Sequence, residues 1–456
     1  MMKNSFYNKL PTFVQELALN LYGFRTIYRR YLWVKYLQKF ADSEFWPVYK
    51  QIDYVSQKLR FILAHAIETV PKYKSLKTLV SDIKNPQKDI FQILLEFPVI
   101  TKSEILEDYS LFLSSRPLTK KIIVTKTSGT TGTPFKVFMN AEVFHIVDAF
   151  AWRRNIWAKY EKGDWIARLV GDPIISLKEK NPKRPYRISF VDKRIYLSTY
   201  HLKRETANIY LRLLEQKKPQ FLMGYPSALH ILGAYALEMK FTPDWTPKAI
   251  LYSSEPLYEH QREVISKVFR ALPRGFYGSA ERVISAAECE HGQYHLSLID
   301  GYIEGQFGIL PNRQPALVTS LLNTVMPLIR FELGDMLNTL PNQKCTCGRT
   351  LPLIEPVVTK KEDYIETPSG RRISSSIITW AFKDLYGIRR SQLVQVDAES
   401  VEIYVDTDPH LFPEIQKKLK DRLNDMFFGE MKLKVILNNN IGITEAGKTR
   451  FVVRLR

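Results

Sequence analysis

KTSGTTGTPFKV, residues Lys126 to Val137, is the stretch of this chain that decides the fold. It directly follows the apolar run IIVT, so the pattern predicts a strand that ends in a loop of serine, threonine and glycine. Such a loop offers closely spaced backbone N–H groups and hydroxyl donors, which suit the phosphates of a nucleotide. Gly129 and Gly132 let the backbone approach those phosphates. The order G-x-x-x-x-G-K-[ST] is absent, so this is not a Walker loop.

Strands and helices alternate on both sides of this loop. Strand-like runs lie at residues 121–127, 164–171, 221–226, 248–255, 274–280 and 315–323, and helix-like patterns at 145–160 and 227–240. The alternation predicts an α/β fold with at least one mostly parallel sheet. Ligand sites in such sheets lie at the carboxyl ends of the strands, where three of these runs end in Gly- or Ser-rich segments.

The pattern changes after Asp363 and predicts a small α+β domain. In order it predicts a hairpin at 365–373, a helix at 374–387, a strand pair at 391–406, a helix at 413–428 and a strand at 431–439. A polar linker at 359–363 precedes it. The last residues, TEAGKTRFVVRLR, place a Gly-Lys pair in a loop.

The first sixty residues predict one or two helices that mix aromatic, aliphatic and basic side chains. The aromatic residues are Tyr28, Tyr31, Trp33 and Tyr36, and they alternate with the basic residues Arg25, Arg29, Arg30 and Lys35. One interpretation is a surface that contacts an anionic membrane or an acidic partner. The other, which we expect on general grounds, is that the aromatic face packs on the core while the charges stay in water.

Composition describes an ordinary globular protein that is strongly basic. The 456 residues carry 66 Lys and Arg against 47 Asp and Glu, a net charge of +19, which suits nucleic acid, an anionic membrane or a polyanionic small substrate. We expect no nucleic-acid binding, because no known nucleic-acid module or basic tail is present. The sequence has no secretory signal pattern and no apolar run long enough to span a bilayer, so we expect a cytoplasmic protein.

Further motifs follow the first loop in a fixed order, and together they resemble those of the adenylate-forming superfamily. They are LYSSEPL at 251–257, FYGSAE at 276–281, RFELGDM at 330–336, TCGRTLP at 346–352 and TEAGKTR at 444–450. The closest resemblance is to the phenylacetate–CoA ligase group, including members that act in capsular polysaccharide biosynthesis. It implies a large N-terminal adenylation domain of several subdomains, residues 1–360, and a small mobile α+β lid domain, residues 361–456, that carries the catalytic lysine.

The resemblance implies a role for each matching residue. The phosphates of ATP would be held by Thr127, Ser128, Gly129, Thr130, Thr131 and Gly132. The adenine would lie beside Ser254, Glu255 and Pro256, with Tyr277 and Gly278 flanking the adenylate. Glu281 would coordinate Mg2+, a hard cation that prefers oxygen ligands, and Asp335 would accept hydrogen bonds from the ribose hydroxyls.

Lys448 resembles the catalytic lysine of the lid domain, and Thr131 and Glu281 would act in catalysis with it. The chemistry requires a cation, because the acyl carboxylate and the α-phosphate are both anions. At the domain hinge the family's Gly-Arg pair is replaced by TKKED, so Lys360 would stand near the ribose and Glu362 at the hinge. This departure concerns the rotation of the small domain between the two half-reactions.

The three cysteines form a second group of candidate ligands. Cys345 and Cys347 flank one residue in CTCG, and Cys289 precedes two histidines in ECEHGQYH. Three thiolates and one imidazole suit a closed, structural Zn2+ site. Relatives in the phenylacetate–CoA ligase group imply His295 as the fourth ligand, with His291 as the alternative, and three reduced thiols without metal remain a second interpretation.

The function implied by the resemblance is ATP-dependent activation of a carboxylic acid as acyl-AMP, followed by transfer to CoA. One alternative acceptor is an amine or hydroxyl of a sugar in capsular or exopolysaccharide biosynthesis, which would give an amide or ester. A second alternative is a non-catalytic scaffold at the membrane periphery. The acid pocket is expected to include Gly224, Tyr225 and Pro226, the strand end from Tyr252 to Ser254, and Phe276. It is more aromatic than charged, which favours an aryl or modest apolar acid.

Overall fold

The computed structural model describes residues 7, 10–119, 121–126, 135–176, 179, 181–312, 314–357, 364–444 and 448–455, with the side chain of residue 376 excepted. The chain divides into two compact units, each built from several stretches of sequence. The first comprises Met1–Ile27, Ala158–Arg274 and Val358–Arg456, and the second comprises Tyr28–Trp157 and Gly275–Val357.

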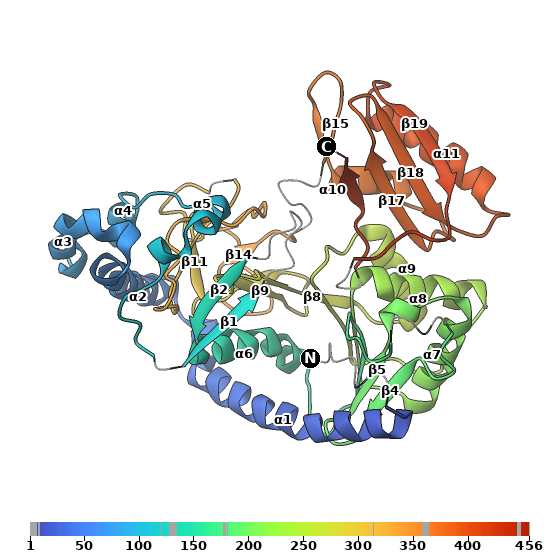
Figure 1. Ribbon diagram of the computed structural model, residues 1–456, viewed down its shortest axis with the longest axis horizontal. Helices are drawn as coiled ribbons and strands as arrows, with labels where there is room; N and C mark the ends of the chain where they lie inside the picture. The colour runs from blue at the N-terminus through green and yellow to red at the C-terminus, as the bar shows by residue number, and fades with distance from the viewer. Residues whose placement is uncertain are drawn as a thin grey trace. The chain divides into compact units, whose positions relative to one another are not determined.

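A mostly parallel sheet lies at the centre of the first unit (Figure 1). Its strands occur in the order β7, β6, β3, β5 and β4, all parallel to their neighbours except β4, which is an antiparallel edge. The bounds are β3 (Ile166–Leu169), β4 (Tyr186–Ser189), β5 (Arg194–Leu197), β6 (Phe221–Gly224), β7 (Ala249–Ser253), α7 (Arg204–Lys217), α8 (Pro226–Glu238) and α9 (Glu259–Phe269). Helices α7, α8 and α9 share one apolar core with these strands. The predicted α/β alternation is confirmed.

The C-terminal part of the same unit is an α+β fold around a four-stranded sheet in the order β19, β18, β17, β20. The bounds are β15 (Tyr364–Glu366), β16 (Arg372–Ser374), α10 (Ser375–Ile378), β17 (Arg390–Gln395), β18 (Ser400–Asp406), α11 (Phe412–Met426), β19 (Lys432–Leu437) and β20 (Val452–Arg454). Helix α11 buries Ile415, Leu419 and Leu423, which recur every four residues on one face. The predicted order of hairpin, strand pair, helix and strand is confirmed.

One predicted helix of this region is shorter than expected. The pattern predicts a helix over 374–387, but α10 ends at Ile378 and gives way to a 3-10 turn over Thr379–Phe382. Phe382 is fully buried in the C-terminal core, and Asp384 then adopts a φ of 58°, which a continuing helix cannot accommodate. Tertiary packing of Phe382 therefore overrides the helical pattern.

The second unit consists of antiparallel sheets and helices. Its strands are β1 (Ile122–Lys126), β2 (Lys136–Asn140), β8 (Pro273–Gly278), β9 (Ser285–Glu288), β10 (Tyr294–Leu296), β11 (Gly301–Ile303), β12 (Leu317–Ser320), β13 (Phe331–Glu332) and β14 (Leu353–Ile354). Strands β8, β9, β10 and β14 pair in that order, and β11, β12 and β13 form a three-stranded sheet. Helix α6 (Ala141–Trp157) shares a core with them. The site residues of this unit lie on or beside these strands.

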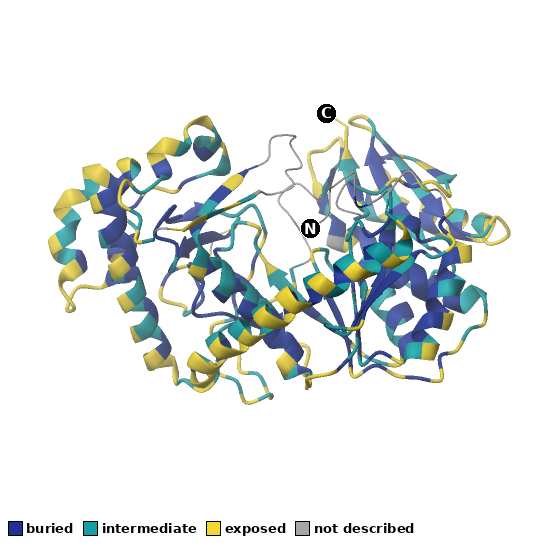
Figure 2. Cartoon of the chain, turned by 60° about the horizontal axis from the view of Figure 1, so that its bottom comes forward, coloured by how far each residue is buried: buried dark blue, intermediate teal, exposed yellow. Residues whose placement is uncertain are grey.

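Two long helices form the N-terminal region, as predicted: α1 (Thr12–Lys39) and α2 (Val48–Thr69). Helix α2 has one buried face, whereas α1 carries large exposed apolar side chains along its length (Figure 2). The expectation that the aromatic face packs on the core is wrong for Tyr28 and Tyr31, which are 62% and 66% exposed. Trp33 does pack inward, with its ring 5.8 Å from that of Trp152. Within the described residues, every helix is too short or too polar to cross a lipid bilayer.

Candidate functional site

The turn from β6 into α8, residues Gly224 to Pro226, lies at the carboxyl end of the parallel sheet. Gly224 is opposite Leu169 on one side, and a Cβ placed on it would lie 2.8 Å from Leu229 Cγ and 3.0 Å from the Leu169 carbonyl oxygen. Only glycine therefore fits there. Pro226 opens the helix, where its missing N–H costs nothing. Together they fix Tyr225 at the edge where ligand sites of such sheets occur.

The end of β7 lies beside this turn, because β7 is the parallel neighbour of β6. Tyr252 is buried and is paired with Gly224, and Ser254 two residues later adopts a φ of 73°. This left-handed conformation is uncommon for a residue with a side chain. After it, Glu255 Oε2 accepts a 3.0 Å hydrogen bond from the Ser227 N–H in the first turn of α8. The carboxylate thus sits at a helix N-terminus, where the dipole favours negative charge.

Lys448 brings a positive charge to this turn. Its Nζ lies 5.7 Å from the centroid of the Tyr225 ring, within the range of a cation–π contact. Burial raises the pKa of Glu255, while the Ser227 N–H and the Lys448 ammonium act in the opposite direction. The loop holding the lysine is closed by Thr444, whose N–H donates to the Lys448 carbonyl oxygen over 2.8 Å. We call Tyr225, Glu255 and Lys448 the Lys448 cluster.

The C-terminal part reaches this turn because it packs on α8 and α9. The buried His230 on α8 bonds through Nε2 to the Ile388 carbonyl oxygen, 2.8 Å away, and Arg389 forms a 2.8 Å ion pair with Glu238 at the end of α8. The ring of His260 on α9 lies 5.5 Å from that of His230. Burial lowers the pKa of His230 to about 4 and that of His260 to about 3, so both are neutral near pH 7.

Sequence reasoning missed this pair of histidines. His230 lies in the otherwise apolar run SALHILGAYAL, and a histidine that interrupts such a run is a signal for a buried polar contact.

The second unit gathers the other described site residues. Tyr277 Oη donates a 2.7 Å hydrogen bond to Asp335 Oδ2. Burial, followed by the charges of Asp335 and Glu281, raises the pKa of Tyr277 well above its ordinary value. Tyr277 and Gly278 end β8, and Asp335 follows Gly334, which has a φ of 80°. The structure therefore brings two predicted carboxylates to one tyrosine.

Phe276 and Glu281 belong to the same region. The Phe276 ring faces the Arg154 guanidinium at 5.4 Å. Arg282, next to Glu281, is turned away by a φ of 59° and pairs with Asp148 at 2.8 Å.

Part of the predicted site lies outside the described residues. This applies to the phosphate-loop residues Thr127, Ser128, Gly129, Thr130, Thr131 and Gly132, and to Lys360 and Glu362 of the hinge. The division between residues 360 and 361 lies in the same undescribed stretch, so it stays a prediction. Strands β1 and β2 are described on either side of the loop, and they pair up to Lys126 and Lys136.

Three thiols and one imidazole meet in the second unit. Cys289 follows β9, His295 lies on β10, and Cys345 and Cys347 precede β14, and their ligand atoms all lie within 4.8 Å of one another. We call these four residues the thiol cluster. The Cys289 and Cys345 sulfur atoms are 3.6 Å apart, and Cys347 Sγ lies 3.4 Å from His295 Nε2. His291 instead has its Nδ1 2.9 Å from Thr346 Oγ1.

These distances fit a metal ion better than a disulfide. A disulfide requires an S–S distance near about 2.0 Å, whereas sulfur atoms around a tetrahedral Zn2+ with bonds of about 2.3 Å lie about 3.8 Å apart. Burial, followed by the charges of Arg349 and Arg153, lowers the pKa of His295 to about 4 and keeps the imidazole neutral, as a ligand must be. Burial raises the pKa of Cys347, but hydrogen bonds from Arg349 outweigh it and give a net lowering. Geometry thus selects His295, not His291, for the group.

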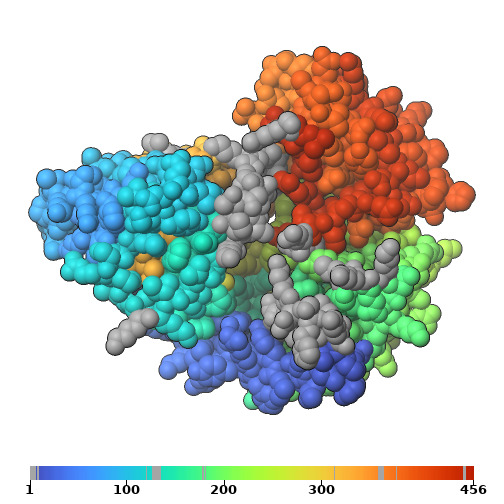
Figure 3. Space-filling model, viewed as in Figure 1, coloured from blue at the N-terminus to red at the C-terminus, as the bar shows by residue number. Residues whose placement is uncertain are grey.

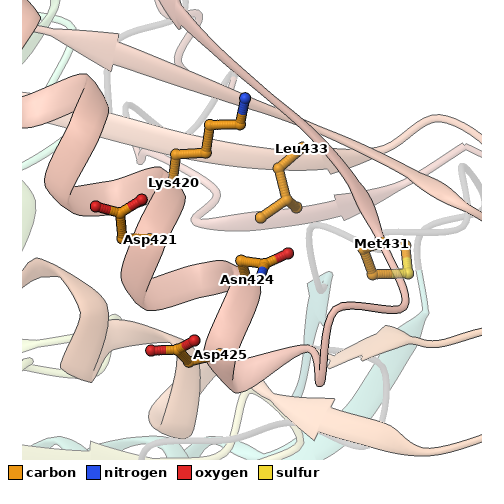
Figure 4. Close-up of a pocket in the computed structure, with 6 residues that line it drawn as sticks. All are labelled: Lys420, Asp421, Asn424, Asp425, Met431 and Leu433. Atoms are coloured by element: carbon orange, nitrogen blue, oxygen red, sulfur yellow. The ribbon is translucent and has the colours of Figure 1, made fainter.

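A shallow hollow of about 510 Å3 lies on the surface of the C-terminal part, between α11 and β19 (Figure 4). It is lined by Lys420, Asp421, Asn424, Asp425, Met431 and Leu433. None of the predicted site residues lines it.

Comparison with known proteins gives concordant results. Residues 365–455 match the family of the CapK C-terminal domain. The chain is 24% identical over 367 residues to Protein CapK of Staphylococcus aureus, covering 78% of this chain and 79% of that protein. Among solved structures it is similar to 2-hydroxyisobutyryl-CoA ligase in the postadenylation state with R3-HIB-AMP, with a TM-score of 0.68, 18% identity and coverage of 91% of this chain and 92% of that one.

The same ligase in complex with 2-HIB-AMP and CoA in the thioesterification state gives a TM-score of 0.52, at 18% identity and 91% coverage of both chains. These likenesses show that the chain has the fold of an adenylate-forming ligase with a separate C-terminal domain. The predicted fold class and the resemblance on which it was based are confirmed.

Proposed function

We propose that this chain is an ATP-dependent adenylate-forming ligase that activates a carboxylic acid as its acyl-AMP. The observation that carries the proposal is the Lys448 cluster. A lysine from the last residues of the chain meets Tyr225 and Glu255 at the carboxyl end of a parallel sheet. An ordinary surface lysine would be surrounded by water, and would not lie beside a partly buried carboxylate and an aromatic ring.

In the first step a carboxylate oxygen of the acid attacks the α-phosphorus of ATP. One P–O bond forms, the bond to the β-phosphate bridging oxygen breaks, and pyrophosphate leaves. Both reactants are anions, so a fixed cation beside them lowers the barrier. Lys448 would supply that cation, and Glu255 and Tyr225 would position it.

The other described residues keep the roles that the resemblance implies, within their own units. Ser254, Glu255 and Pro256 would lie beside the adenine in the first unit. In the second, Asp335 would bind the ribose hydroxyls and Glu281 would hold Mg2+, which neutralises phosphate charge when it is bound. The hydrogen bond from Tyr277 orients the Asp335 carboxylate for this task.

In the second step we propose coenzyme A as the acceptor. Its thiol sulfur attacks the acyl carbon, a C–S bond forms, the acyl C–O bond to the phosphate breaks, and AMP leaves while the thiol proton passes to solvent. The support is that 2-hydroxyisobutyryl-CoA ligase, whose fold this chain shares, binds an acyl-AMP and CoA. The likeness to Protein CapK over most of the chain supports the alternative acceptor, a sugar amine or hydroxyl.

The acid is proposed to be aryl or modestly apolar. Tyr225 supplies partly exposed aromatic surface at the end of the parallel sheet, where Tyr252 is buried opposite Gly224, and Phe276 does so in the second unit. Isotope exchange between pyrophosphate and ATP, measured against aromatic, fatty and amino acids, tests this choice directly.

A single assay series separates the proposed functions. Acid-dependent exchange would establish activation, and it should be lost in Lys448→Ala and kept in Lys432→Ala, an exposed lysine of β19. Acyl-CoA formation would establish the CoA acceptor. If pyrophosphate is released but CoA is neither acylated nor stimulatory, the CoA reading fails. Absence of exchange across the whole panel would favour a non-catalytic scaffold.

We also propose that the thiol cluster binds a structural Zn2+. All four donors are protein side chains of the types that zinc prefers, and a four-coordinate ion held by them would leave no position for substrate. The bound ion would crosslink β10, the end of β9 and the loop before β14, and so stabilise the second unit.

A further inference from the structure

Helix α1 exposes a row of large apolar side chains. The members are Phe13 at 71%, Leu17 at 57%, Leu21 at 63%, Phe24 at 63%, Tyr28 at 62% and Tyr31 at 66% exposure. Their spacing of four, four, three, four and three residues places them on one face of the helix. Because all six lie on one helix, helical geometry alone sets their relative positions. We call this row the α1 face.

The opposite side of the helix makes both polar and apolar contacts, and Leu19 is buried there with Ile174, Ile175 and Tyr196. Gln15 Oε1 accepts a 2.8 Å hydrogen bond from the Arg187 guanidinium, and Asn20 Oδ1 accepts one of 2.9 Å from the Phe190 N–H. Gly23 allows close approach, since a Cβ there would lie 3.1 Å from Ser189 Oγ. The first half of α1 is thus attached to the first unit by these hydrogen bonds and by the small apolar cluster around Leu19.

A helix that served only the fold would expose fewer large apolar side chains than α1 does. Surface helices of globular proteins bury their apolar stripe and expose polar residues. Contiguous exposed apolar patches on monomers mark interaction surfaces. In Figure 2 the long helix across the front turns its exposed residues outward, and in Figure 3 the same helix, in blue, lies on the surface along the lower edge.

The charges on α1 indicate what covers this face. The helix holds five basic residues and one acid, Glu16, which is paired with Arg184 at 2.7 Å. Arg25, Lys35 and Lys39 are exposed beside the apolar row. The whole chain carries a net charge of +19. An anionic surface is therefore the complementary partner, whereas a second copy of α1 would bring the same positive charges into contact.

We propose that α1 docks this protein on the surface of an anionic lipid bilayer. The helix would lie in the plane of the interface, with Phe13, Leu17, Leu21 and Phe24 between the headgroups and the acyl chains. Tyr28 and Tyr31 suit the headgroup level. Arg25, Lys35 and Lys39 would contact lipid phosphates. The proposal rests on the α1 face alone and does not depend on the ligase activity.

Vesicle sedimentation with the full chain tests the proposal. Vesicles of phosphatidylcholine with about 30% phosphatidylglycerol should bind the protein, and added salt should weaken binding. The double variant Leu21→Ser/Phe24→Ser should bind about tenfold more weakly or worse. Its side chains are exposed, so the fold should persist, which circular dichroism checks. The matched control is Leu118→Ser/Leu272→Ser, two leucines that are 63% and 67% exposed elsewhere, and it should bind like the unaltered protein.

Three results would overturn the proposal. The first is failure of the unaltered protein to bind anionic vesicles at low salt. The second is equal binding by Leu21→Ser/Phe24→Ser, or equal binding to vesicles of phosphatidylcholine alone. The third is a concentration-dependent dimer in sedimentation velocity that the α1 variant abolishes, because a second copy would then cover the face.

Discussion

The Lys448 cluster and the thiol cluster are both assembled from three stretches of sequence, but different forces hold them together. In the thiol cluster, β9, β10 and β14 are neighbouring strands, so sheet register brings Cys289 and His295 close. The Lys448 cluster is held together because the C-terminal part packs on α8 and α9, through the hydrogen bond of His230 and the ion pair of Arg389. A sheet is hard to open locally, whereas a docked domain can separate. We therefore expect the thiol cluster to govern stability and the Lys448 cluster to govern activity.

Lys448→Ala should give the largest effect. It removes the cation beside Glu255 and should lower acid-dependent ATP–pyrophosphate exchange by about 10²–10³-fold. The melting temperature should change little, because the side chain is only partly buried. Lys432→Ala serves as the control and should keep full exchange. Exchange within a few-fold of normal in Lys448→Ala would remove the lysine from the mechanism.

Cys345→Ser should show the opposite pattern. Loss of one ligand should release Zn2+ and lower the melting temperature by roughly 5–10 °C, with exchange retained at low temperature. Metal content by mass spectrometry and thermal unfolding measure both effects. His291→Ala is the matched control, since its ring faces Thr346 and not the thiols. Absence of zinc from the unaltered protein would contradict the metal site itself. Loss of zinc from His291→Ala would contradict the assignment of His295.

Lowering the pH should destabilise the packing of the C-terminal part on α8 and α9, because His230 and His260 are buried there as neutral rings. The pKa of His230 is lowered by burial to about 4 from its ordinary 6.5, so below pH 6.5 the unfolded chain binds more protons than the folded one. The stabilisation is complete above pH 6.5 and is lost as the pH falls toward 4, a difference of about 3 kcal/mol.

Thermal unfolding measured between about pH 7.5 and 4.5 checks this dependence. The variant His260→Phe keeps an aromatic ring against Tyr258 and Phe382, and it should flatten part of the pH dependence. Identical slopes for the variant and the unaltered protein would exclude His260 as a contributor.

Tyr277→Phe should have the smallest effect. It removes one hydrogen bond to Asp335 without leaving a cavity, and we expect the KM for ATP to rise about three- to tenfold with little change in kcat. Initial rates at varied ATP measure this split. A fall in kcat at constant KM would mean that Tyr277 acts in the chemical step.

The strand and helix order was predictable because the apolar periodicity of an element depends on its own secondary structure and buried face, and not on how the elements are arranged. The C-terminal succession from residue 365 onward is an example, as are the strands that end at Gly224 and Ser253. The thiol cluster was predictable because a chain with three cysteines offers few combinations. His295 could be preferred to His291 only by resemblance, until the geometry of β10 and Thr346 was known.

Other features depend on tertiary contacts that a sequence does not express. The orientation of α1 is one. Its aromatic and basic side chains are spread around the helix, and periodicity defines a face without showing whether that face is buried or exposed. The early end of α10 is another, since burial of Phe382 decides it. The contact of His230 with the Ile388 carbonyl oxygen joins residues far apart in sequence.

Gly224 limits how the turn between β6 and α8 can be altered. Any side chain there would collide with Leu229 and the Leu169 backbone, so the floor of the turn cannot be reshaped by substitution. If the turn contacts the acid, new specificities must come from residues beside it, such as the partly buried Tyr225. A directed-evolution library should therefore keep the glycine fixed and randomise Tyr225.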